Sequence, residues 1–317
     1  MTANDWQQRI ITVFGGGGFI GRYVCEALFK TGVRVRVAQR TPRDAFFLQP
    51  LAAVGQLDLV RADFTRPDTV EAAIEGAWGV INLVGAFGGK LGTLHGDTPG
   101  RIAEMAATKS VESLVHISAI GVAKDSASLY SRTKAEGEDK VRAAYPQATI
   151  IRPSVVFGQE DEFTNRFAGM SRLPLVPVLG GKTRFQPIYV RDLGAAIAKA
   201  AQNPDDFGGK TFELGGPDVL TMHELNRVIA KAAGRSSELI DLPDFVGDVM
   251  SRFGFLRGAP ITRDQWIMLQ KDNVASGPGL EAFGIQGTPL AAVAPDWLDR
   301  FNEGGRFASR RAQASVG

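Results

Sequence analysis

The chain of 317 residues contains a single cysteine, Cys25, so it can form neither an internal disulfide nor a metal cluster of cysteine ligands. Long apolar runs are also missing. No stretch approaches the roughly 20 residues needed to cross a bilayer, and the first residues lack the apolar core of a signal peptide. The net charge of +2 gives no field strong enough to indicate nucleic acid as a partner. The expected location is cytoplasmic, or at most on a membrane surface.

Histidine is scarce as well. His95, His116 and His223 share no spacing that is typical of metal ligands, and they are expected to be structural or surface residues. An acidic cluster at residues 160–162 has two interpretations, a metal site or the solvated start of a helix. The second is favoured because acidic side chains complement the dipole at a helix N-terminus. The sequence therefore predicts no metal site.

A glycine-rich turn dominates the N-terminal part of the chain. The segment Ile10–Val24 reads IITVFGGGGFIGRYV, in which an apolar stretch runs into glycines at the spacing GxxGxxG. Glycines at this spacing allow a tight turn, close approach of the backbone to a pyrophosphate, and helix-to-strand packing. A glycine turn without a ligand is the alternative, which the strand before it and the helix after it disfavour. The candidate cofactor-binding residues are Gly15, Gly18, Phe19, Ile20, Gly21 and Arg22.

The pattern after this turn predicts an α/β protein. Strand-like and helix-like patterns alternate through short connections, which is typical of a parallel sheet covered on both faces. Right-handed crossovers then give a doubly wound Rossmann sheet. The expected strands are Ile10–Phe14, Val33–Ala38, Leu57–Arg61, Gly79–Val84, Leu114–Ser118 and Ala148–Arg152. The expected helices are Phe19–Thr31, Asp68–Glu75, Thr98–Lys109 and Leu129–Ala144.

The end of the second strand distinguishes between NAD and NADP. An acidic residue about 20 positions after the glycine turn would bind the free ribose 2′-hydroxyl of NAD, and none is present. Arg40 lies there instead, with Arg22 and Arg43 nearby, and guanidinium groups suit a 2′-phosphate. The sequence therefore favours NADP(H) over NAD(H), although Arg43 is expected to be a solvated surface residue. Asp63, at the end of the third strand, is expected to meet the adenine.

Candidate catalytic residues follow the fifth strand. Ser118 closes that strand, and Tyr130 and Lys134 follow in the segment YSRTK, one helical turn apart. A lysine ammonium beside a tyrosine hydroxyl favours the phenolate, so we expect the pKa of Tyr130 to be lowered from about 10. Tyr130 would then act as acid or base, and Ser118 would orient a substrate oxygen. Val84 and Gly85, after the fourth strand, are expected to pass close to the ribose and nicotinamide.

Several longer motifs add to these residues. They are TVFGGGGFIGRYV, HISAIG before YSRTKAEGE, IIRPSVVFGQEDEFTNRFAGM, FQPIYVRDLGAAIAKA, and ITRDQWIMLQKDNVAS followed by FGI. With them the chain resembles the extended, atypical branch of the short-chain dehydrogenase/reductase superfamily, and within it the nucleotide-binding accessory subunit of respiratory complex I and its bacterial relatives. The resemblance implies a tightly held NADP(H) with a structural role. It also implies that Pro153, Ser154 and Val155 border the nicotinamide.

The regular alternation stops after Pro153, which predicts a second lobe. We expect residues 1–157, with segment 182–202 returning, to form the NAD(P)-binding Rossmann domain. Residues 158–181 and 203–303 would form a smaller C-terminal, substrate-side lobe, and residues 304–317 a flexible tail.

Two segments of the region beyond Pro153 have specific expectations. The run 174–181, PLVPVLGG, contains two prolines and is interpreted as an extended loop over the nicotinamide end of the cofactor. Phe185–Val190 is expected to be a strand, and Asp192 is expected to cap a helix that continues through Ala201.

Residues 243–260, PDFVGDVMSRFGFLRGAP, carry an apolar helical face flanked by Arg252 and Arg257. This face either packs within its own lobe or docks on a partner or a membrane surface. Exposed apolar area would favour docking, and complete burial would exclude it. The apolar residues are Phe245, Val246, Val249, Met250 and Phe253.

Three functions are consistent with these observations. The first is an NADP(H)-holding accessory subunit of complex I, peripheral on the cytoplasmic face of the inner membrane, with the nucleotide as a stabilising ligand. The second is an active NADP-dependent oxidoreductase, epimerase or dehydratase acting on a small carbonyl or hydroxyl substrate through Ser118, Tyr130 and Lys134. The third is an NADP(H) redox sensor.

Overall fold

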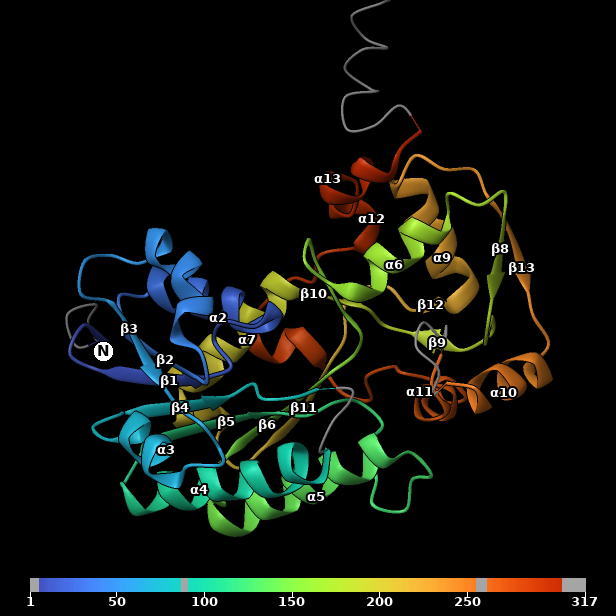
Figure 1. Ribbon diagram of the computed structural model, residues 1–317. Coiled ribbons are helices and arrows are strands. Elements are labelled where there is room, and N and C mark those ends of the chain that lie inside the picture. The colour runs from blue at the N-terminus through green and yellow to red at the C-terminus, as the bar shows by residue number, and fades with distance from the viewer. Residues whose placement is uncertain (1–5, 87–90, 255–260, 304–317) are drawn as a thin grey trace, which may run out of the picture. The chain divides into compact units, whose positions relative to one another are not determined.

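The computed structural model describes residues 6–86, 91–254 and 261–303 (Figure 1). The chain divides into two compact units. The first comprises the chain up to Pro153, Val190–Leu214 and Ala275–Gln286. The second comprises Ser154–Tyr189, Gly215–Val274 and the chain from Gly287 onward. The predicted tail and residues 255–260 of the predicted apolar helix lie outside the described residues.

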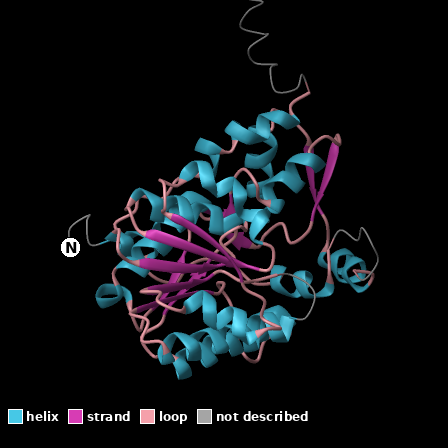
Figure 2. Ribbon diagram, turned by 60° about the vertical axis from the view of Figure 1, so that its left-hand side comes forward, coloured by secondary structure: helices cyan, strands magenta, loops and turns pink. Residues whose placement is uncertain are grey.

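A parallel sheet of seven strands forms the centre of the first unit (Figures 1 and 2). The strand order β11-β6-β5-β4-β1-β2-β3 confirms the predicted doubly wound sheet. Six strands were predicted to within two residues, whereas β11 was assigned to the second lobe. The strands are β1 (Ile10–Phe14), β2 (Arg34–Gln39), β3 (Leu57–Arg61), β4 (Gly79–Asn82), β5 (Ser113–Ile117), β6 (Thr149–Pro153) and β11 (Thr211–Leu214).

Helices cover both faces of this sheet (Figure 1). One face carries α2 (Phe19–Lys30) and α7 (Val190–Gln202), and the other carries α3 (Pro67–Ile74), α4 (Thr98–Thr108) and α5 (Leu129–Ala144). Every residue of β4 and β5 is buried, as expected for strands covered on both faces. Other helical segments of this unit are η1 (Pro42–Leu51), η2 (Gly92–Asp97), α8 (Pro204–Phe207) and η3 (Gly279–Phe283).

The segment that returns to the first unit differs from the predicted one. It begins at Val190 and continues to Leu214, because β11 pairs with β6 and extends the sheet. Helix α7 already begins at Val190, so Asp192 lies in its first turn and does not precede it as a cap. The stretch Ala275–Gln286, which the sequence analysis placed in the lobe, also belongs to the first unit.

Within the described residues, the second unit contains three two-stranded sheets and several helices. The strand pairs are β7 (Val156–Phe157) with β10 (Ile188–Tyr189), β9 (Arg184–Phe185) with β12 (Leu220–Thr221), and β8 (Leu175–Val178) with β13 (Glu238–Asp241). The helical segments are α6 (Glu162–Met170), α9 (Met222–Ala232), α10 (Asp244–Arg252), α11 (Arg263–Leu269), α12 (Leu290–Val293), α13 (Pro295–Leu298) and η4 (Asp299–Phe301). Among the helices described in either unit, none combines the length and the apolar composition that crossing a bilayer requires.

Three predictions for the second unit need correction. Residues 174–181 are not an extended loop, because they contain strand β8. A two-stranded sheet consists only of edges, so Pro177, which lacks an N–H group, is accommodated opposite Ile240. The predicted strand Phe185–Val190 is replaced by the short strands β9 and β10. The acidic cluster does start a helix, α6, but its cap Asp161 is buried, and this burial raises the pKa of its carboxyl group.

Gly137 on α5 provides a test of the packing in the first unit. A Cβ at this position would overlap the backbone carbonyl oxygen of His95 in η2. Gly137→Ala is therefore expected to push the two elements apart and lower the free energy of unfolding by about 1–3 kcal/mol. Gly92→Ala is the matched control, since no atom of another described segment lies within 4 Å of its Cβ position. Urea denaturation of both variants checks this prediction, and equal losses would contradict it.

Candidate functional site

The glycine turn joins β1 directly to α2. Gly15 has a φ of +81°, a conformation that favours glycine. A Cβ at Gly21 would overlap the carbonyl oxygen of Gly15, so only glycine lets α2 pack against the turn. Gly18 precedes α2 and offers no side chain to cap it. The first N–H groups of the helix, at Phe19 and Ile20, are therefore suited to an anionic group such as a phosphate.

Gln39, the last residue of β2, contacts this turn. Its Oε1 accepts a hydrogen bond from the Gly17 N–H at 3.0 Å, and its Nε2 donates to the carbonyl of Thr41 at 2.7 Å. A neutral side chain thus occupies the end of the strand at which a carboxylate would select NAD. The missing carboxylate was expected from the sequence, whereas the contact of Gln39 with the turn was not.

Arg40 and Asp63 follow the ends of neighbouring strands, β2 and β3. Arg40 is exposed. The carboxylate of Asp63 accepts hydrogen bonds from the N–H and hydroxyl groups of Thr65. These bonds, with the charges of Arg61 and Arg40, lower the pKa of Asp63. The structure therefore brings these two predicted site residues into one neighbourhood.

Arg22 and Arg43 differ in their surroundings. The guanidinium carbon of Arg22 lies 4.2 Å from the centre of the Phe47 ring, a cation–π arrangement. Arg43 is exposed at the start of η1. Arg22 is thus held against an aromatic ring beside the glycine turn.

The loop after β4 lies against the predicted catalytic lysine. The Val84 N–H donates to Asn82 Oδ1 at 3.1 Å, which ties the loop to the strand. A Cβ at Gly85 would lie 3.5 Å from Lys134 Nζ and 3.8 Å from His95 Nε2. The structure therefore brings Gly85 together with Lys134, although 49 positions separate them in the sequence.

The predicted catalytic residues lie at the carboxyl end of β5 and on α5. Lys134 is only 4% exposed, and its Nζ donates to the carbonyl of Ile117 at 3.0 Å. Burial lowers the pKa of Lys134 to about 8, against the opposing effect of the Glu138 carboxylate. Ser118 directly follows β5, and its Oγ is buried without a hydrogen-bond partner among the described residues. This hydroxyl is an orphaned polar atom that a bound group would satisfy.

Tyr130 does not have the lowered pKa that the sequence predicted. Burial raises the pKa of its hydroxyl to about 12. The expected lowering is therefore wrong, because the desolvation of the phenolate exceeds any effect of the lysine, whose own ammonium is buried and faces the Ile117 carbonyl. Tyr130 is accordingly neutral and a proton donor at pH 7.

Two histidines that were expected to be structural or surface residues lie close to these groups. The ring of His95 is fully buried and meets that of Tyr130 edge to face, with centroids 5.2 Å apart. His116 on β5 lies with its Nδ1 3.2 Å from Asn82 Nδ2. Its Nε2 is buried and has no partner in the described parts of the chain. Burial, together with the charge of Lys134, lowers both histidine pKa values, that of His95 to about 4, so both rings are neutral at pH 7.

Pro153 ends β6, and the next two residues begin the second unit. The Pro153 carbonyl accepts a hydrogen bond from the Ile120 N–H at 3.1 Å. In the second unit, the Ser154 hydroxyl lies 2.6 Å from Asn273 Oδ1, and the Val155 N–H donates to the same oxygen at 3.2 Å. Asn273 belongs to the DNV motif of the sequence. This motif thus holds the backbone that leaves β6.

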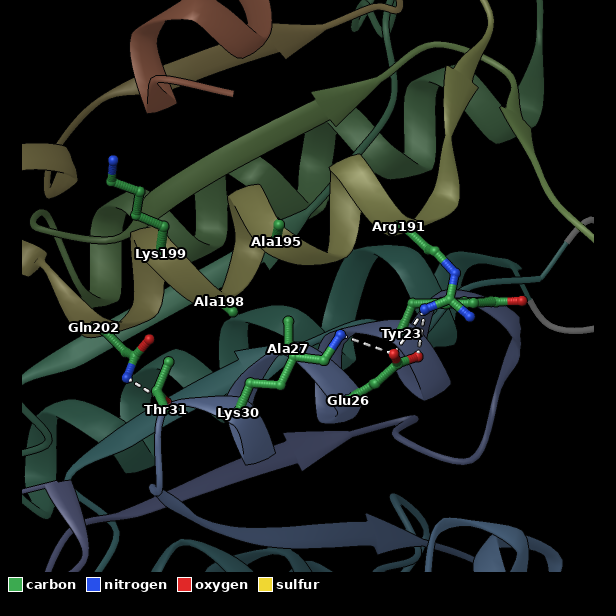
Figure 3. A pocket seen from close by; sticks show the side chains of 10 residues that line it. All are labelled: Tyr23, Glu26, Ala27, Lys30, Thr31, Arg191, Ala195, Ala198, Lys199 and Gln202. Carbon is green, nitrogen blue, oxygen red and sulfur yellow. Dashed lines mark hydrogen bonds and ion pairs between the residues drawn. The ribbon is translucent and has the colours of Figure 1, made fainter. Parts of the chain in front are cut away.

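A groove of about 380 Å³ lies between α2 and α7, on the helical layer of the first unit (Figure 3). Ala27 is one of the residues that line it. Glu26 accepts hydrogen bonds from Lys30 at 2.9 Å and from Arg191 at 2.7 Å, and Lys199 donates to a backbone carbonyl. These charged side chains already pair within the protein, so the groove is less suited to a ligand than the strand ends are.

The fold and the residues at its strand ends define an NAD(P)-binding protein of the short-chain dehydrogenase/reductase type. The model of the NAD dependent epimerase/dehydratase family matches residues 11–215, and the chain belongs to this family. The predicted resemblance is thereby confirmed at the level of the family.

Its relatives include both a respiratory subunit and reductases. NADH dehydrogenase (ubiquinone) 1 alpha subcomplex subunit 9, mitochondrial, of Rattus norvegicus is 35% identical over 302 residues, which cover 92% of this chain and 80% of the relative. Ceramide reductase of Caulobacter vibrioides is 31% identical over 241 residues, and the match covers 74% of each chain. The solved NADPH-dependent quinone oxidoreductase of Escherichia coli, complexed with NADPH, has a similar fold. Its TM-score is 0.73 at 18% identity, and the match covers 91% of this chain and 100% of that one.

Lys134→Met is expected to raise the free energy of unfolding at pH 7 by about 1–3 kcal/mol. Burial disfavours the ammonium, and each tenfold loss of proton affinity corresponds to about 1.4 kcal/mol. The folded-state pKa of about 8 lies below the usual 10.5. The penalty is therefore complete below pH 8 and disappears as the pH rises toward 10.5.

Urea denaturation of both proteins between pH 7 and pH 10 measures this difference. Lys140→Met is the control, because Lys140 is partly exposed and pairs with Asp97 and Glu136. That variant is expected to gain no stability. An equal gain in both variants, or a gain for Lys134→Met that persists unchanged at pH 10, would contradict the argument.

Proposed function

We propose that this protein holds NADP(H) as an accessory or assembly subunit of respiratory complex I, with the nucleotide as a stabilising ligand. The observation that carries the proposal is the extent of the match to the mitochondrial subunit. The family model ends at residue 215, whereas the 35% identity covers 92% of the chain. The similarity therefore extends through most of the second unit, which a match confined to the nucleotide-binding domain would not include.

The residues at the strand ends suit a dinucleotide. The glycine turn and the N-terminus of α2 would receive the pyrophosphate, and Arg40 would receive a 2′-phosphate. Asp63 would lie near the adenine. Gly85 and Lys134, which lie together, would meet the ribose and nicotinamide, and Ser118 supplies an unsatisfied hydroxyl there. When bound, the nicotinamide supplies a donor or acceptor of hydride.

For the nucleotide, we expect the protein to bind NADPH more tightly than NADH, and Arg40→Ala to remove most of this difference. Loss of a charge-assisted hydrogen bond to the 2′-phosphate should weaken NADPH binding about 10- to 100-fold and leave NADH binding nearly unchanged. Arg43→Ala, which removes another exposed arginine nearby, is the control. Equilibrium titrations measure the affinities for NADPH and NADH of the unaltered protein and of both variants. Equal affinities of the unaltered protein for NADPH and NADH would refute the assignment.

An active reductase is the second candidate, favoured by the three catalytic-type residues and by the ceramide reductase relative. A neutral Tyr130 with a raised pKa is a proton donor. In the reduction of a carbonyl, the hydride would go to carbon and the Tyr130 proton to oxygen. Ser118 would hold that oxygen, and Lys134 would supply a nearby positive charge. The state of Tyr130 thus supports the reductive direction.

We further propose a peripheral membrane contact through α10, on the cytoplasmic face of the inner membrane. Phe245 and Val249 of α10, and Phe253 directly after it, are 69%, 51% and 55% exposed. They lie four positions apart, so they share one side of the helix. An exposed apolar stripe of this kind favours an interface with lipid or a partner. Val246 and Met250, assigned by the sequence analysis to the same face, are half-buried. The exposure of this stripe supports docking over burial within the unit.

Gentle purification from the membranes and the cytosol of the native cells tests both roles. We expect recovery with complex I subunits and about one retained NADP(H) per chain.

The double variant Phe245→Glu and Phe253→Glu is expected to shift the protein to the cytosol, because charged groups oppose burial in lipid. Leu173→Glu, at another exposed apolar site, is the control and should not shift it.

The opposite result would be that the protein is recovered without complex I subunits and that its nucleotide exchanges freely. If turnover of a carbonyl substrate were then found and Tyr130→Phe abolished it while nucleotide binding persisted, the reductase would replace the accessory role. A protein that changes its partners when NADPH replaces NADP would instead support a redox sensor.

A further inference from the structure

His95 lies in η2, before α4, and its hydrogen bonds have a definite direction. Its Nε2 accepts a hydrogen bond from the Ala86 N–H at 3.0 Å. A ring nitrogen that accepts carries no proton, so the proton of the neutral ring is on Nδ1. Nδ1 lies 3.4 Å from Thr133 Oγ1, and this hydroxyl lies 3.1 Å from the Tyr130 carbonyl, to which it donates. The groups form one consistent series: Ala86 N–H to His95, His95 to Thr133, and Thr133 to the Tyr130 carbonyl.

This series joins two segments that carry proposed nucleotide contacts. One end is the loop after β4, which contains Gly85. The other end is the first turn of α5, which contains Tyr130 and is followed one turn later by Lys134. The His95 ring also packs edge-on against the Tyr130 ring, and its backbone carbonyl packs against α5 at Gly137. A single buried side chain therefore contacts both the loop and the helix.

The series requires a neutral histidine. A protonated His95 would lose its acceptor for Ala86 and would place a second cation beside Lys134. Burial and the charge of Lys134 lower the pKa of His95 to about 4, whereas the pKa of Lys134 is about 8. At pH 7 the positive charge therefore lies on the lysine, and the histidine remains a bridge between the two segments.

We infer that His95 is a positioning residue for the nicotinamide end of the site, where it holds the loop at Gly85 and the Tyr130 turn of α5 in a fixed relation. It acts through these two segments and touches no reacting atom. The inference rests on the proposed function, because the positioned groups are those that would meet the nicotinamide and its ribose.

The test compares three substitutions at this position. His95→Gln keeps an acceptor at the place of Nε2, and His95→Asn keeps a polar group only at the place of Nδ1. His95→Leu keeps neither. The probes are NADPH, followed by titration and by its nicotinamide fluorescence, and 2′,5′-ADP, which lacks the nicotinamide half. Thermal unfolding of each variant without nucleotide reports its folding.

We expect His95→Leu to weaken NADPH binding by about tenfold or more and to alter the nicotinamide fluorescence, while 2′,5′-ADP binding changes less than about twofold. His95→Gln should restore NADPH binding to within about threefold, and His95→Asn should not, because only Gln reaches Ala86. If His95→Leu does not fold, the NADPH affinities of His95→Gln and His95→Asn still test whether the hydrogen bond to Ala86 matters. Thr133→Val, which breaks the other end of the series, should shift the nicotinamide fluorescence in the same direction.

Three results would overturn the inference: unchanged NADPH binding by His95→Leu, equal losses for NADPH and 2′,5′-ADP, or equal rescue by Gln and Asn. The unaltered protein separates these from a failure of the proposed function. If it binds neither probe, the nucleotide role is wrong and the inference is lost with it. If it binds both and the variants do not differ, only the role of His95 is wrong.

Discussion

A buried ammonium group, that of Lys134, determines what can surround it. Removing this cation from water is costly, and a single carbonyl hydrogen bond from Ile117 offsets only part of that cost. The carboxylate whose charge favours this ammonium, that of Glu138, is already held by Arg152 through two hydrogen bonds. The two histidines beside the lysine are neutral, which avoids further repulsion. A charge kept inside the protein at a cost in stability, and only partly compensated by the chain itself, is typical of a group that serves a ligand.

The features that could be predicted from the sequence are those that depend on residues close together in the chain. The glycine turn and the YSRTK segment were found because backbone conformation at Gly15 and the spacing along one helix depend only on near neighbours. The link between Ala86, His95 and Thr133 spans three separate segments, and no periodicity reports such a contact. The place of strand β11 in the sheet is set by its pairing with β6, which lies about 60 positions earlier in the chain, so no local pattern indicates it. The proline in β8 was misjudged because edge position is a tertiary property.

The motifs most specific to the complex I branch have structural roles in the second unit. Asn273 of DNV binds the backbone after β6, and Asp161 of FGQEDEF caps α6. In TRDQ, Thr262 and Gln265 form a reciprocal capping box at the start of α11. These residues satisfy backbone groups and do not form a reactive centre. The resemblance they carry is therefore one of architecture.

The surroundings of Tyr130 bear on both holding a nucleotide and turning it over. A reductase must return a proton to the Tyr130 hydroxyl after each cycle, and a pKa near 12 makes the neutral form the resting one. The hydrogen-bond series through His95 cannot carry that proton, because it begins at a backbone N–H and ends at a backbone carbonyl. A peptide N–H donates a hydrogen bond and a peptide carbonyl accepts one, and neither group titrates near neutral pH. The series fixes the geometry of these segments and transfers no proton to the Tyr130 hydroxyl, which is not one of its members. The role of His95 is thus to position the loop and the helix, and this role is the same whether a bound nucleotide is held or turned over.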